Sequence, residues 1–100
     1  MADRYILVNG EPVEADDLHG WARWYEAHSD ERVVQQDIVG DGVKVSTVFL
    51  GLNHNFGKDG PPVLWETMIF GGPHDEYQQR YTSKADALAG HATALWLAKA

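Results

Sequence analysis

The chain of 100 residues contains no cysteine, and this absence excludes several kinds of chemistry. Without thiols there is no disulfide framework, no thiolate zinc site and no cysteine nucleophile. Long apolar runs are missing too, because no stretch approaches the roughly 20 residues that a membrane-spanning helix needs. The first residues lack the basic flank and apolar segment of a signal peptide. We therefore expect a soluble, cytoplasmic protein without a membrane partner.

Basic residues are few, since eight Lys and Arg stand against fifteen Asp and Glu, for a net charge of −7. Direct binding to nucleic-acid phosphates needs clustered Lys and Arg, so the balance argues against it. The acids Glu11, Glu14, Asp16 and Asp17 gather where the first helix is expected to begin. Negative charge near a helix N-terminus interacts favourably with the helix dipole, which gives this cluster a structural explanation. An alternative interpretation is an acidic nucleic-acid mimic that occupies a basic partner.

Catalytic motifs are missing as well. None of the three serines lies in a GxSxG elbow, and the chain has no P-loop, no GxGxxG and no HExxH. The sequence therefore favours a protein without catalytic residues, cofactor or metal.

Hydrophobic residues make up 44% of the chain, which is typical of a globular protein, and the length is that of a single domain spanning 1–100. Tryptophan is abundant, and each indole can bury about 150–250 Å². We expect most of these side chains in the core and, as an alternative, one or two on a partner surface. The tryptophans are Trp21, Trp24, Trp65 and Trp96.

The N-terminal third predicts a hairpin and a helix. The apolar run 5–8 precedes Asn9-Gly10, the strongest two-residue hairpin signal, and Pro12 limits the returning strand to a short or edge strand. Apolar residues at helical spacing over 15–28 then predict a helix, with Asp16 and Asp17 at its start.

The remaining two thirds predict strands and a final helix. The patterns predict strands over 32–39, 43–49, 63–70 and, more briefly, 77–81, and a helix that begins at Thr82 or Ser83. Short turns exclude parallel pairing. We expect an α+β fold, an antiparallel sheet of three to five strands with two helices on one face, in the order β-β-α-β-β-β-(β)-α. The expected apolar stripe of the last helix is Ala85, Leu88, Ala89, Ala92, Leu95 and Trp96.

The most informative stretch is 45–72, where two apolar strands flank the connection 53–62, which is rich in Gly, Pro and Asn. This connection exceeds the usual roughly 4–6 residues, and loops on a rigid scaffold often carry function. With the neighbouring segment 71–77 it predicts a binding surface for a partner protein or a small anionic, nucleotide-like ligand. A satellite core beneath the loop is the alternative. The predicted binding residues are Asn53, His54, Asn55, Phe56, Lys58, Glu66, His74, Tyr77 and Arg80.

Glu66 interrupts an otherwise apolar strand. On the core face it would need a cationic partner, with Arg80 and Arg32 as candidates. If Glu66 instead faces solvent, Trp65 and the residues that share its face of the strand are the buried ones. Glu66 thus serves either a structural salt bridge or a functional carboxylate.

A second hypothesis joins three of these residues. If the two loops meet, His54, Glu66 and His74 form a His, His, carboxylate set that suits zinc or iron. The alternative function is then a metal- or carboxylate-dependent small hydrolase.

Several segments together point to a known group of proteins: STVFLGLNHNFGKDGPPVLWETMIFGG, Tyr77, Arg80-Tyr81, Ala87, Ala89-Gly90-His91 and the helix 18–25. With these segments the chain resembles a group of short hypothetical proteins encoded by bacteriophages and by bacteria with prophage-like regions. The resemblance covers most of the chain and implies a phage accessory role in the host cytoplasm, such as host interaction, anti-defence or minor assembly. It implies no particular activity and no site residues. We therefore expect a small non-catalytic binding protein of a host or phage partner, as a monomer or a homodimer.

Overall fold

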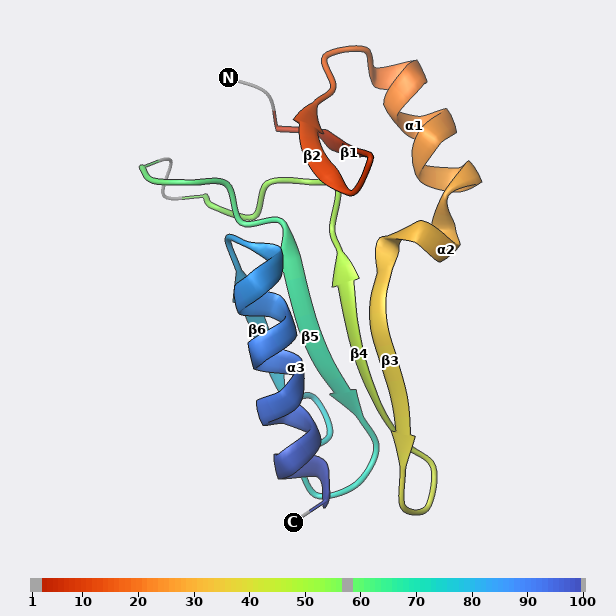
Figure 1. The fold of residues 1–100 in the computed structure, drawn as a ribbon, viewed down its shortest axis with the longest axis vertical. Helices are drawn as coiled ribbons and strands as arrows, with labels where there is room; N and C mark the ends of the chain where they lie inside the picture. Colours follow the sequence, from red (N-terminus) through yellow and green to blue (C-terminus); the bar gives the residue numbers. More distant parts are fainter. Residues whose placement is uncertain (1–2, 57–58, 100) are drawn as a thin grey trace.

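The computed structural model describes residues 3–56 and 59–99 and begins with a hairpin and a helix (Figure 1). Strands β1 (Tyr5–Val8) and β2 (Glu11–Glu14) pair antiparallel. Asn9 and Gly10 between them both have positive φ, 52° and 81°, as the tight turn favoured by Asn-Gly requires. Helix α1 (Leu18–Ala27) begins after Asp17, whose carboxylate accepts a hydrogen bond from the His19 amide at 3.2 Å. The predicted hairpin and helix start are confirmed.

A four-stranded antiparallel sheet forms the main body, in the order β3-β4-β5-β6. A single-turn helix, α2 (Ser29–Arg32), leads into it. Helix α3 (Lys84–Lys99) covers one face of this sheet (Figure 1) and begins after Ser83, whose hydroxyl accepts from the Asp86 amide at 3.1 Å. The α+β class, the antiparallel pairing and the predicted order of the strands are confirmed. The strands are β3 (Val33–Val39), β4 (Val43–Phe49), β5 (Trp65–Phe70) and β6 (Gln78–Tyr81).

Helix α1 lies elsewhere than expected. It packs against the β1–β2 hairpin beyond one end of the large sheet, so α3 is the only described helix lying along that sheet's face (Figure 1). The indole N–H of Trp21 donates to the carbonyl of Tyr5 at 3.1 Å and to that of Gly51 at 3.2 Å. This shared donor joins α1 to the hairpin and to the chain leaving β4. An amphipathic pattern shows that a helix has a buried side, but it does not identify the sheet that the helix covers.

The core lies between α3 and alternate residues of the two central strands. Thr47 of β4 and Thr67 of β5 are directly opposite each other in the register, and both are fully buried among apolar neighbours. The period of two places every second side chain of these strands on the α3 face. The buried set on this face is Val45, Thr47, Phe49, Trp65, Thr67 and Ile69 from the strands and Ala87, His91 and Ala94 from α3.

The expected stripe of α3 is wrong in its direction. Leu88 and Trp96 are 42% and 71% exposed, and the helix instead turns His91 toward the sheet. Because α3 is apolar nearly all round, its pattern contains no polar side from which the buried side can be inferred. None of the described helices, α3 included, is long and apolar enough to cross a membrane.

Candidate functional site

Two asparagines shape the described part of the 53–62 connection. The side-chain oxygen of Asn53 accepts from the backbone amides of Asn55 at 2.8 Å and of Val63 at 3.0 Å. The side-chain amide of Asn55 donates to the carbonyls of Asp59 at 2.7 Å and of Pro61 at 3.1 Å. These bonds join the two sides of the connection. Side-chain to backbone hydrogen bonds of asparagine thus stabilise a loop that has no strand partner.

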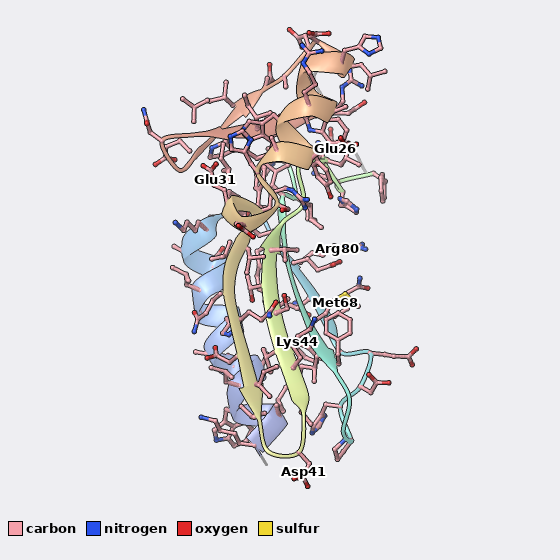
Figure 2. All side chains as sticks on the ribbon, turned by 90° about the vertical axis from the view of Figure 1, so that its right-hand side faces the viewer. Glu26, Glu31, Asp41, Lys44, Met68 and Arg80 are labelled. Atoms are coloured by element: carbon pink, nitrogen blue, oxygen red, sulfur yellow. The ribbon has the colours of Figure 1, made fainter. Side chains whose placement is uncertain are left out.

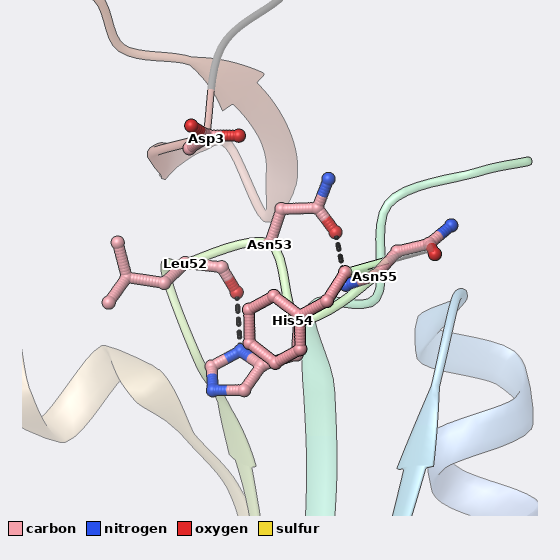
Figure 3. Close-up of a pocket in the computed structure, with 6 residues that line it drawn as sticks. Asp3, Leu52, Asn53, His54 and Asn55 are labelled. Carbon is pink, nitrogen blue, oxygen red and sulfur yellow. Dashed lines mark hydrogen bonds between the residues drawn. The ribbon is translucent and has the colours of Figure 1, made fainter. Parts of the chain in front are cut away.

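A pocket of about 500 Å³ opens beside this connection (Figure 3). The Nδ1 atom of His54 lies 2.9 Å from the carbonyl oxygen of Leu52. A carbonyl only accepts, so Nδ1 carries the proton, and Nε2 of the neutral ring is then an acceptor. Phe56 is 74% exposed, with its ring 5.7 Å from the imidazole. The lining residues are Asp3, Leu52, Asn53, His54, Asn55 and Phe56.

The pocket offers a carboxylate, an imidazole, amide groups and an exposed phenyl ring. Asp3 belongs to it because its backbone carbonyl accepts from the Asn53 amide at 2.8 Å. Within residues 3–56 and 59–99, no hydroxyl or thiol nucleophile lines the pocket. Among the described residues no three His, Asp or Glu side chains lie close enough together to hold a metal ion. The arrangement therefore suits recognition by stacking and hydrogen bonding.

The two loops of the predicted surface do not meet. The 53–62 connection precedes β5 and the 71–77 segment follows it, so they lie at opposite ends of that strand (Figure 1). A strand of six residues is about 20 Å long. The prediction that His74 and Tyr77 share a surface with His54 is therefore wrong, and so is the metal set of His54, Glu66 and His74. Lys58 lies outside the described residues.

Glu66 belongs to a cross-strand ion pair on the sheet face opposite α3, where Figure 2 shows Arg80, Met68 and Lys44. One carboxylate oxygen accepts from Nε of Arg80 at 2.9 Å and from Nε2 of Gln78 at 2.7 Å. Although it is on the outer face, Glu66 is only 8% exposed. The partner is Arg80, one of the two expected. The guanidinium of Arg32 lies instead over the ring of Tyr25. Both Glu66 and Arg80 thus have a structural role away from the pocket.

The sequence did not predict a buried polar chain between α3 and the sheet. His91 is fully buried, with Nε2 2.8 Å from Oδ2 of Asp37 and Nδ1 2.6 Å from Oγ1 of Thr47. The Thr47 hydroxyl lies 2.5 Å from that of Thr67. An ionised carboxylate only accepts, so Nε2 carries a proton and Nδ1 of the neutral ring accepts from Thr47.

The hydrogen-bonded series Asp37, His91 and Thr47 has the carboxylate, imidazole and hydroxyl order of a hydrolytic triad. However, both Thr47 and His91 have no exposed surface, so no substrate reaches either side chain. Its role is structural. Two features of the sequence could have indicated these hydrogen bonds. Each of two apolar strands has a threonine among its alternating apolar residues, and one His lies at helical spacing between Ala87 and Ala94.

The hydrogen bond from His91 lowers the pKa of Asp37 below its ordinary 3.8. A carboxyl whose pKa is lower in the folded state stabilises the fold above its unfolded pKa, and this stabilisation is lost as the pH falls through the folded pKa. We expect Asp37→Asn to be less stable than the wild type near neutral pH, with the difference shrinking in acid. Urea unfolding of both proteins between about pH 7 and about pH 2.5 measures it. A difference that does not change with pH contradicts the assignment.

Comparison of the chain with protein-family models, with curated protein sequences and with solved structures returns no match. The resemblance to phage-encoded proteins stays a prediction.

Proposed function

We propose that the protein is a non-catalytic binding protein that holds a segment of a partner protein in the pocket beside 52–56. The observation that carries this proposal is Phe56, which is 74% exposed at the rim of the pocket. Aromatic side chains that project beside a concave site are typical anchors of protein interfaces. The side-chain hydrogen bonds of Asn53 and Asn55 hold the backbone that precedes Phe56. Because this part of the loop is already ordered, the entropic cost of binding is lower.

The charge of the site favours a neutral or basic segment over a small anion. Asp3 places a carboxylate in the lining, the lining residues that the structure describes include no Lys or Arg, and the chain has a net charge of −7. An anionic ligand would be repelled by this field, whereas a basic peptide would be attracted. A volume of about 500 Å³ is that of ordinary small-ligand pockets and admits one large side chain with its backbone. The phage accessory role, with a host protein as partner, rests on the sequence resemblance alone.

The test is a peptide-display selection on the wild-type protein, followed by affinity measurement on Phe56→Ala. We expect the selected peptides to bind at least about 30-fold more weakly to the variant, because it lacks the aromatic ring on which they pack. His54→Ala is expected to have a smaller effect, because it removes one acceptor and part of the stacking surface. Isothermal titration calorimetry measures both.

The matched control is Phe70→Ala, because Phe70 is 41% exposed on the outer sheet face, away from the pocket. It should leave peptide affinity unchanged. A thermal-shift panel of nucleotides examines the anionic alternative, since a ligand that binds the folded state raises Tm. The proposal fails if the selected peptides bind Phe56→Ala as well as wild type, or if a nucleotide raises Tm and Phe56→Ala abolishes that shift.

A further inference from the structure

The face of α3 that points away from the sheet has no charge along most of its length. From Ala87 to Ala98 the sequence contains no Lys, Arg, Asp or Glu, and its single ionisable residue, His91, is buried. Trp96 is 71% exposed and Leu88 42%. A helix that covers a sheet normally presents charged side chains to solvent, whereas a helix that is apolar all round is typically buried on both sides. A second surface is therefore expected to cover this face.

The exposed residues are spaced symmetrically about Ala92. Leu88 lies four residues before it and Trp96 four residues after it. Steps of four residues keep side chains on one helix face and advance them by about 6 Å. If two copies of α3 crossed antiparallel at Ala92, Trp96 of each copy would meet Leu88 of the other. The exposed alanines, Ala85, Ala89 and Ala92, would leave room for the indole.

The charges at the two ends of α3 fit the same arrangement. Asp86 lies in the first turn and Lys99 in the last. An antiparallel pair places the end of α3 that carries Asp86 beside the end of the other copy that carries Lys99, and it also opposes the helix dipoles. A parallel pair would bring like charges together. The remaining charge, Lys84, lines a separate pocket with Trp65 and Gly10, so it points away from this face.

We propose that the exposed face of α3 is a self-association surface on which two copies of the chain pair antiparallel through Trp96, Leu88 and Ala92. A helix of 16 residues is about 24 Å long, so the contact area is below that of the larger obligate dimers. The expected dissociation constant is therefore on the order of 10–100 µM. This interface is independent of the Phe56 pocket.

Sedimentation equilibrium across about 5–500 µM protein tests the proposal. Wild type is expected to shift from monomer to dimer within this range, and Trp96→Glu to remain monomeric because it places a carboxylate in the contact. The matched control is Ile38→Glu, since Ile38 is 62% exposed and lies on a strand rather than on α3. It should dimerise as wild type does. A wild type that is monomeric throughout, or a Trp96→Glu that still dimerises, overturns the proposal.

A charge exchange tests the antiparallel geometry without touching the apolar contact. Asp86→Lys alone and Lys99→Glu alone should each weaken the dimer several-fold, because each places like charges opposite one another. The double variant should recover most of the affinity, since the opposite charges meet again with their signs reversed. Circular dichroism confirms that each variant keeps its helices. If the loss of dimerisation free energy in the double variant equals the sum of the losses in the two single variants, the antiparallel arrangement is wrong.

Discussion

Replacing His91 with alanine is expected to lower the free energy of unfolding by about 3–4 kcal/mol. The substitution leaves a cavity beneath α3 and removes the hydrogen-bond partner of the Thr47 hydroxyl, and both sites are fully buried. For a domain of this size the loss corresponds to a fall in Tm of roughly 15–25 °C. Urea unfolding monitored by tryptophan fluorescence measures it.

Two further variants separate the polar chain from simple loss of volume. His19→Ala removes an exposed imidazole from α1 and should change stability by less than about 0.5 kcal/mol. In the triple variant Thr47→Val, Thr67→Val and His91→Leu, apolar groups replace the two hydroxyls and the imidazole together, so none of these three groups is left buried without its partner. It should recover most of the loss. If His91→Ala costs less than about 1 kcal/mol, the hydrogen-bonded chain does not stabilise the fold.

Gly90→Ala is expected to destabilise the protein by about 1–2 kcal/mol, although alanine is the better helix former. In a free helix the change would gain about 1 kcal/mol. Here a methyl group at position 90 would overlap the hydroxyl and ring of Tyr81, which packs against the core. A rigid ring moves only if its neighbours move with it, and overpacking of this kind costs about 1–3 kcal/mol or more. Chemical unfolding of the purified variant checks the sign.

A double-mutant cycle with Tyr81 identifies the cause. In a Tyr81→Ala background the ring is gone, so Gly90→Ala should no longer destabilise and should show the gain expected from helix propensity. If Gly90→Ala costs the same free energy in both backgrounds, the tyrosine is not the obstacle.

Local signals in the sequence predicted much of the fold. Asn9-Gly10 specified its turn through the positive φ of both residues, and Asp17 and Ser83 specified helix starts through their side-chain oxygens. The rotation of α3 was not predictable in this way. It depends on which side chain finds a polar partner across the sheet, and His91 finds one in Thr47, 44 residues away.

The candidate site was predicted in part for the same reason. Residues 53–56 are contiguous, so the sequence alone could place Asn53, His54 and Phe56 together. The grouping with His74 failed because one strand separates the two loops, a separation that the predicted strand over 63–70 already implied. Glu66 paired with Arg80 because the two residues are opposite each other in the register of β5 and β6, and the pattern could offer Arg80 only as one candidate.

One wall of the pocket comes from the N-terminal segment, and this has a thermodynamic consequence. The Tyr5 amide donates to the Gly51 carbonyl at 2.8 Å, and the indole N–H of Trp21 donates to the carbonyls of both Tyr5 and Gly51. Undocking of the β1–β2 hairpin would carry Asp3 away from Asn53, so occupancy of the site and attachment of the hairpin are linked equilibria. A bound peptide would then slow amide hydrogen exchange in residues 5–14, a segment that contributes none of the pocket's lining.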